Sequence, residues 1–220
     1  MTSMEEYRQH FPIFEEKIYI NSCSYGALSY EVENAFLSYL KDRHEKGADW
    51  LAWCDRLERV RALFAKLIGA KSDEIAVTTS ASASLSAVAS SLDFSGTRTK
   101  IITTDLAFPT EAQSWHALKK NGAEVVHVKE KDGMIDLDDL ATLVDEKTLL
   151  VSIPLVCYRN GALADVVAIR KIARKAGALV LVDAYQGVGA VPIDVKDWDV
   201  DFIVGGSLKY LLSTAGVGFL

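Results

Sequence analysis

Two stretches near the end of the chain, ALVLVDAYQ at residues 178–186 and DFIVGGSLK at residues 201–209, decide the fold. Each contains a short apolar run that predicts a buried strand. Each run leads into polar groups, Asp183 and Gln186 after the first strand and Lys209 after the second. Because parallel strands bring their carboxyl ends to one edge of a sheet, we expect these side chains to converge there.

The same strand-then-helix rhythm runs through most of the chain upstream of these stretches. Strands are predicted over residues 17–21, 74–79, 100–104, 123–128, 148–156, 178–182 and 200–204, and residues 215–220 look like the opening of another. Helices are predicted over residues 30–44, 51–68, 82–91, 109–120, 137–144 and 165–176. Repeated units of this kind predict an α/β fold, with a mainly parallel sheet covered by helices on both faces.

Composition narrows the class of protein further. The chain has 220 residues, half of them hydrophobic, which is enough for one large domain, and we expect residues 17–220 to form it behind an N-terminal segment at residues 1–16. A net charge of −6 with scattered basic residues argues against nucleic acid as a partner. No apolar run is long enough to span a membrane, and the first residues do not resemble a signal peptide. Three widely spaced cysteines fit a reducing compartment, so a cytoplasmic location is predicted.

The strand ends carry chemically useful groups, each of which also has a structural interpretation. The serine-rich run at residues 80–84 could cap a helix, or could bind an anion through free backbone N–H groups. Phe108 could be a core residue, and Asp183 could cap a turn. Lys209 is harder to explain as a surface residue, because apolar and glycine residues flank it. A lysine in apolar surroundings has a lowered pKa and becomes a usable amine nucleophile.

Together these groups match the needs of pyridoxal 5′-phosphate. That cofactor needs an amine to form a Schiff base and an acid that keeps its pyridine nitrogen protonated. It also needs an anion cradle for its phosphate and a flat partner for its ring. Lys209 and Asp183 would fill the first two roles, Ala81 with Ser82 the third, and Phe108 the fourth.

With these residues in place, the chain resembles the class V aminotransferase family, which includes cysteine desulfurases, selenocysteine lyases, kynureninases and isopenicillin N epimerase-like proteins. The likeness is strongest over residues 181–194 and 201–212, where an acid-x-x-Gln motif precedes a lysine after the next strand. The resemblance implies that Lys209 is the Schiff-base lysine and that Asp183 is the acid at the pyridine nitrogen. It implies that Gln186 lies beside the phenolic oxygen of the ring.

The resemblance assigns the remaining cofactor contacts as well. Ala81 would give a backbone N–H and Ser82 a hydroxyl to the phosphate, and Ser207 would lie near it. Phe108 matches the ring-stacking position, which is His in cysteine desulfurases. Two positions depart from the family pattern, since Cys157 and Leu208 stand where many relatives carry polar groups near the cofactor.

The resemblance also sets expectations for the whole protein. It implies a fold type I pyridoxal-phosphate enzyme that works as a homodimer on an amino acid or small amine, by aminotransferase, epimerase or lyase chemistry. Family members are nearly twice as long, and their small C-terminal domain, with the arginine that binds the substrate carboxylate and the desulfurase cysteine, is expected to be absent from this chain.

Other functions stay open at this point. Cysteine desulfurase or selenocysteine lyase activity is the alternative within the family. A non-enzymatic remnant without cofactor is a second alternative. A nucleotide-binding dehydrogenase is a third, resting on the lone GxG at residues 187–189. The four histidines show neither metal-ligand nor triad spacing, so no metal site is predicted.

Overall fold

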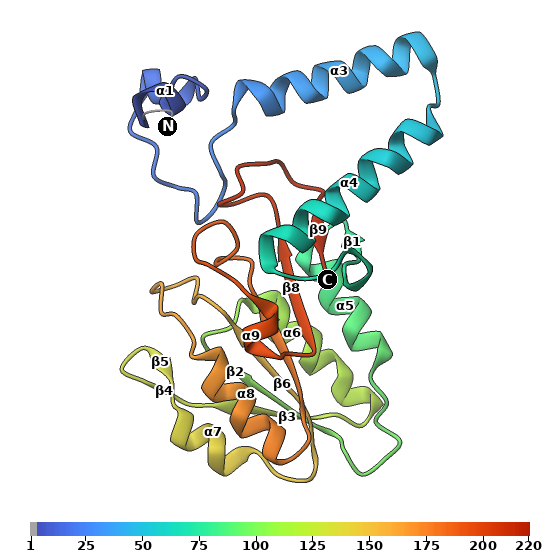
Figure 1. Ribbon diagram of the computed structural model, residues 1–220. Coiled ribbons are helices and arrows are strands. Elements are labelled where there is room, and N and C mark those ends of the chain that lie inside the picture. Colours follow the sequence, from blue (N-terminus) through green and yellow to red (C-terminus); the bar gives the residue numbers. More distant parts are fainter. Residues whose placement is uncertain (1–3) are drawn as a thin grey trace.

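The computed structural model describes residues 4–220 and is built around one seven-stranded sheet (Figure 1). The strand order is β1-β9-β8-β7-β6-β2-β3. The bounds are β1 (Val77–Thr78), β2 (Lys100–Thr104), β3 (Glu124–Val128), β6 (Thr148–Pro154), β7 (Leu179–Asp183), β8 (Phe202–Gly206) and β9 (Gly218–Phe219). Strands β3, β2, β6, β7 and β8 run parallel, whereas β9 runs antiparallel to both β8 and β1. The predicted α/β class is therefore confirmed.

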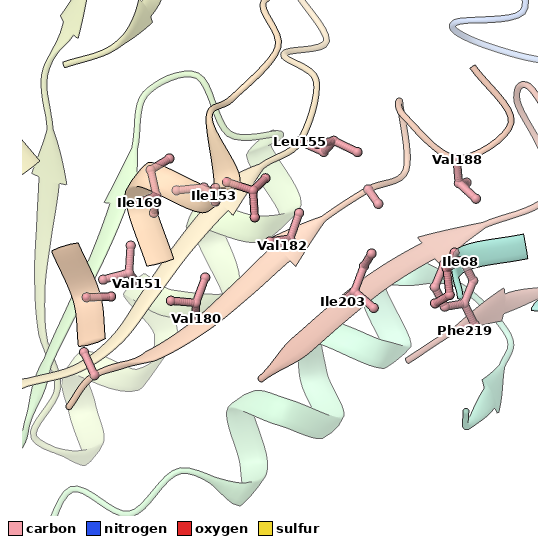
Figure 2. Close-up of a cluster of buried hydrophobic side chains, with 14 of the residues drawn as sticks. Ile68, Val151, Ile153, Leu155, Ile169, Val180, Val182, Val188, Ile203 and Phe219 are labelled. Atoms are coloured by element: carbon pink, nitrogen blue, oxygen red, sulfur yellow. The ribbon is translucent and has the colours of Figure 1, made fainter. Parts of the chain in front are cut away.

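Helices cover both faces of this sheet, as predicted. On one face pack α4 (Trp50–Ile68), α7 (Leu137–Leu143) and α8 (Val166–Lys175). Figure 2 shows Ile169 of α8 near Val151 and Ile153 of β6, and Ile68 of α4 against Phe219 of β9. On the other face pack α5 (Ala81–Ser91), α6 (Pro109–Ala117) and the short helix η2 (Leu118–Asn121). The central strands are apolar on both sides because both sides are covered.

The first part of the chain lies outside this layered body. It contains α1 (Met4–Arg8), α2 (Ile13–Glu16) and α3 (Tyr30–Lys46), and Figure 1 shows α3 reaching away from the sheet. The hydroxyl of Ser29 caps α3, and the carboxylate of Asp49 caps α4. Helix α4 ends at Gly69, whose φ of 75° is a left-handed conformation that favours glycine. No side chain of α3 is buried.

Several smaller features differ from the sequence-based expectations. Residues 17–21 do not form a strand, because this segment finds no sheet edge to pair with and both Ile18 and Ile20 are almost fully exposed. The expected strand at residues 74–79 is shortened to β1, because the helical turn η1 (Ser72–Glu74) precedes it. The hairpin of β4 (Glu130–Lys131) with β5 (Met134–Ile135) and the short helix α9 (Val195–Trp198) were not predicted.

No helix within residues 4–220 combines the length and the apolar character needed to cross a membrane.

Candidate active site

A cavity of about 480 Å³ opens at the carboxyl ends of the parallel strands. Residues from the loops after β1, β2, β6, β7 and β8 line it, together with the segment around Cys23. All of the predicted site residues except Ser207 lie in its wall, namely Ala81, Ser82, Phe108, Asp183, Gln186 and Lys209. The strand-end argument therefore located the cavity correctly.

Lys209 follows β8 and is buried, with 9% of its surface exposed. Burial lowers the pKa of its ammonium group, and the nearby Asp183 carboxylate partly offsets that effect. Its Nζ lies 4.8 Å from the centre of the Tyr185 ring and 5.7 Å from that of Phe108. The amine thus lies close to two aromatic rings, and its burial shifts the protonation equilibrium toward the neutral, nucleophilic form.

The backbone around Lys209 is fixed by a segment far away in sequence. The N–H of Gly26 donates to the carbonyl of Leu208 at 2.9 Å. A Cβ at Gly26 would lie only 2.4 Å from the carbonyl oxygen of Lys209, so only glycine fits this close approach. The loop after β8 is therefore clamped against the segment that precedes α3.

Asp183 is the last residue of β7 and is buried at the floor of the cavity. Its Oδ1 accepts a hydrogen bond from the N–H of Tyr185 at 2.9 Å. Burial raises the pKa of this carboxyl, while the Tyr185 N–H and the charge of Lys209 act in the opposite direction. A cation in the cavity would stabilise the carboxylate further.

The N-terminus of α5 forms one side of the cavity. The hydroxyl of Ser80 accepts a hydrogen bond from the N–H of Ala83 at 3.1 Å and so caps the helix. The first amides of a helix have no intrahelical acceptor, which leaves those of Ala81 and Ser82 available to an anion. The capping interpretation of the serine run is therefore confirmed, and anion binding stays a prediction. The hydroxyl of Ser84 ties α5 to the sheet by donating to the carbonyl of Phe219 at 3.0 Å.

Phe108 lies at the cavity rim and outside the core, with 45% of its surface exposed. It is the residue before Pro109, the first residue of α6, and its ring packs edge-on against Tyr158 at 5.2 Å between centroids. Gln186 donates from Nε2 to the carbonyl of Cys23 at 3.0 Å, while its buried Oε1 has no hydrogen-bond partner. Both side chains face a space that a flat ligand could fill.

Ser207 lies apart from these residues. It is buried, its hydroxyl donates to the carbonyl of Val217 at 3.2 Å, and it does not line the cavity. Its expected place near the phosphate stays a prediction. Cys157, noted for its departure from the family pattern, is likewise buried away from this cavity, whereas Leu208 does line it.

The sequence did not point to several other residues of the wall. Tyr185 and Tyr158 are aromatic, and nothing in their spacing distinguishes them from core residues. Glu111 is entirely buried in the first turn of α6, where acidic residues are common for reasons of helix electrostatics. Burial, followed by the charge of Asp183, raises the pKa of Glu111 to about 8. The sequence carried one signal for Glu111, namely an acidic residue close to the predicted ring-stacking residue Phe108.

Comparison with known proteins places the chain in a family. The sequence profile described as Aminotransferase class-V matches residues 36–220. The Bacillus subtilis protein described as the uncharacterized aminotransferase YcbU is 39% identical over 98% of this chain. A kynureninase of Bacillus cereus is 33% identical, also over 98% of this chain. The chain covers 58% of the first relative and 53% of the second, so it spans little more than half of their lengths.

A solved structure agrees with this assignment. The apo structure of a cysteine desulfurase from Thermococcus onnurineus NA1 superposes with a TM-score of 0.85 and 26% identity. The match covers the whole of this chain and 56% of that one. Pyridoxal 5′-phosphate is the cofactor that this family uses, and the sheet with its cofactor-side loops is the fold type I architecture. The chain belongs to the class-V aminotransferase family.

Proposed function

We propose that this chain forms the pyridoxal-phosphate-binding part of an enzyme that acts on an amino acid or small amine, with Lys209 bonded covalently to the cofactor. One observation carries the proposal. A single cavity holds a buried amine whose pKa is lowered and a buried carboxyl, Asp183, which acts on it electrostatically. Burying a lysine of this kind lowers the stability of the folded chain, and use of its nitrogen in a reaction is the best explanation for it.

The residues present fit the cofactor. The first amides of α5 can receive a phosphate, because the capping hydroxyl of Ser80 serves only Ala83. Asp183 supplies a carboxylate for a protonated ring nitrogen, and Phe108 lines the cavity with 45% of its surface exposed. The unpartnered Oε1 of Gln186 marks a polar position in the wall that the protein alone leaves unsatisfied. Gln186 Nε2 also keeps one hydrogen beyond the one it gives to Cys23.

When bound, pyridoxal phosphate supplies an electron sink for the negative charge that develops at the substrate carbon. Asp183 would hold a proton on the pyridine nitrogen and so keep that sink effective. Lys209 would attach the cofactor through Nζ, and once displaced by substrate it could carry a proton to or from the reacting carbon. Phe108 and Tyr158 would exclude water from that side of the cavity.

Among the reactions of the family we favour aminotransferase, epimerase or lyase chemistry over desulfuration of cysteine or selenocysteine. The support is Phe108, because the resemblance places a histidine at this position in cysteine desulfurases. A lone GxG at residues 187–189 gives no support to a dehydrogenase, because Gly187 and Gly189 lie in a turn after β7 and are not among the residues that line this cavity.

We also propose that the working form is a cytoplasmic homodimer. The homodimer is supported by the apolar surface on α3 and α4. Phe36, Leu37 and Leu40 on α3 and Trp50 and Leu51 on α4 are at least half exposed. A second copy of the chain is the occupant that we assign to this surface, since two-fold dimers are the commonest assemblies.

Reductive labelling tests the central assignment. The chain is incubated with pyridoxal phosphate, reduced with borohydride, digested and mapped by mass spectrometry. We expect the pyridoxyl group on Lys209, and no comparable labelling in Lys209→Ala. Stable attachment to another lysine would overturn the role of Lys209. Failure to take up any cofactor would support the non-enzymatic alternative.

A further inference from the structure

A second buried acid lies beside Asp183 and has no role in the function proposed above. Glu111 on α6 has none of its surface exposed, and it lines the same cavity. The hydroxyl of Ser152 on β6 donates to its Oε1 at 2.6 Å. Its Oε2 is buried without a hydrogen-bond partner. A fully buried carboxylate with one orphaned oxygen is very costly, whereas a neutral carboxylic acid is not.

The surroundings of Glu111 contain further polar atoms that lack partners. The indole Nε1 of Trp115, one turn along α6, is buried and unpartnered, and so is Oγ1 of Thr103 on β2. Trp115 packs with Ile101 of β2. Thr103 lies two residues after Ile101 on the same strand, so the Thr103 side chain is on the same face of the sheet as Trp115. Within residues 4–220 no basic side chain shifts the pKa of Glu111; the charge of Asp183 raises it, and the Ser152 hydroxyl and the Trp115 indole lower it.

The two acids therefore compete for one negative charge. Lys209 acts on Asp183, and the N–H of Tyr185 donates to its Oδ1, so both stabilise the charge there. Among the described residues no cation acts on Glu111, and the Ser152 hydroxyl and the Trp115 indole, which favour its charged form, are outweighed by burial and by the charge of Asp183. Two adjacent buried carboxyls do not both ionise readily, and the better-solvated one keeps the charge. Asp183 is that one.

We propose that Glu111 is a neutral carboxylic acid that keeps the proton of the Glu111–Asp183 pair, so that Asp183 carries the charge that faces the cofactor. Ser152 donates to Oε1, which makes Oε1 the carbonyl oxygen and leaves the proton on Oε2. Glu111 acts through Asp183 and is a positioning residue. The part of this inference that concerns the cofactor rests on the proposed function of Asp183, but the protonation of Glu111 does not.

Infrared spectroscopy of the cofactor-free chain tests the protonation directly. A neutral carboxylic acid has a C=O stretch that a carboxylate lacks. The wild type minus Glu111→Gln difference spectrum at neutral pH should show this band, and the band should disappear as the pH rises through about 8. Glu124→Gln, which removes an exposed carboxyl on β3, is the matched control and should show no such band at neutral pH. A difference spectrum that shows a carboxylate at neutral pH would overturn the proposal.

Two further variants shift the same band in opposite directions. Asp183→Asn removes the neighbouring charge, so the band should disappear at lower pH than in the wild type. Ser152→Ala removes a hydrogen bond that favours the charged form, so the band should persist to higher pH. These variants keep Glu111 in place, and they decide the question if Glu111→Gln does not fold. Unchanged behaviour in both would contradict the pairing.

The cofactor-bound chain provides a second readout. Its visible spectrum should show a pH-dependent step in the wild type that Glu111→Gln removes, because only the wild type can lose the proton from position 111. If Lys209 is labelled but this step and the infrared band are both unaffected by Glu111→Gln, the inference is wrong and the proposed function stands. If the infrared band is present but labelling misses Lys209, the proposed function is wrong and the protonation of Glu111 stands.

Discussion

The ring of Tyr185 contacts both Lys209 and Gly206, with the Lys209 amine 4.8 Å from its centre and its edge packed on the backbone of Gly206. A Cβ at Gly206 would lie 2.1 Å from Cε2 of that ring. The ring therefore occupies the space that a side chain at Gly206 on β8 would fill, and from there it shields the Lys209 amine from water.

Replacing Tyr185 with alanine should raise the pKa of Lys209. Burial is the main cause of the lowered pKa, and removal of the ring admits water to the amine. Loss of the cation–π contact acts the other way, but it is worth only about 0.5–1 kcal/mol at a partly open site. The pH dependence of Lys209 acylation in the cofactor-free chain measures this. Tyr185→Phe keeps the ring and should react like the wild type, so an equal shift in both variants would contradict shielding by the ring.

Asp183→Ala should abolish most catalysis without unfolding the chain. We expect turnover of the active enzyme to fall by several orders of magnitude, because a pyridine ring without its proton is a poor electron sink. Cofactor attachment to Lys209 should persist, since the amine is separate from the acid. Steady-state turnover and cofactor absorbance, measured on the same sample, separate the two effects. Near-normal turnover would remove Asp183 from the mechanism.

Phe108→Ala should weaken cofactor binding up to about tenfold and leave the cofactor-free chain nearly as stable as the wild type. A ring stacked against the cofactor contributes roughly 0.5–1.5 kcal/mol beyond burial of area. Phe108 is 45% exposed, so its loss opens no core cavity. Phe219→Ala is the contrasting variant, because that ring is fully buried and its removal should cost about 3–5 kcal/mol of unfolding free energy. Equal destabilisation in both variants would show that Phe108 behaves as a core residue.

Acid should weaken the fold through Asp145, which follows α7. Its Oδ2 lies 2.7 Å from Nζ of the buried Lys100, and this hydrogen bond is the main cause of its lowered pKa. A lowered pKa in the folded state means stability that is present above the ordinary value of 3.8 and lost as pH falls through the folded value. Asp145→Asn should therefore melt at a lower temperature than the wild type at neutral pH, with a gap that closes in acid. Glu146→Gln, at an exposed neighbour, should show no such gap.

The sequence predicted the sheet and most of the cofactor-side residues for a physical reason. A period of two in the strands and a period near four in the helices are local signals, and parallel strands deliver their ends to one edge. Asp183 and Lys209 could be placed in this way because Asp183 ends the buried strand β7 and Lys209 lies shortly after the end of β8. Residues 17–21 misled the same reasoning, because β-branched and aromatic residues there satisfy a strand pattern without any partner strand.

Residues that depend on contacts between distant segments could not be predicted in this way. The pairing of Glu111 with Ser152 joins residues 41 positions apart, and the hydrogen bond of Gln186 to Cys23 spans 163 positions. Ser207 directly precedes the lysine loop, but its hydroxyl donates to the carbonyl of Val217, so its part in cofactor binding stays a prediction. Proximity along the chain indicates which edge of the sheet a residue occupies, but not whether its side chain enters the cavity.

The pairing of β1 with β9 has a consequence for how the protein is made. Val77 pairs with Phe219 and Thr78 with Gly218, while Ala76 and Leu220 exchange two backbone hydrogen bonds. Among the described residues, β9 is the sole link between β1 and the rest of the sheet. On the ribosome, the central parallel strands can assemble first and α5 can pack on β8, but the first turns of α5 lack the hydrogen bond from Ser84 to Phe219 until residues 218–219 emerge. We therefore expect nascent chains that stop short of Gly218 to bind the cofactor more weakly, whatever the state of Lys209.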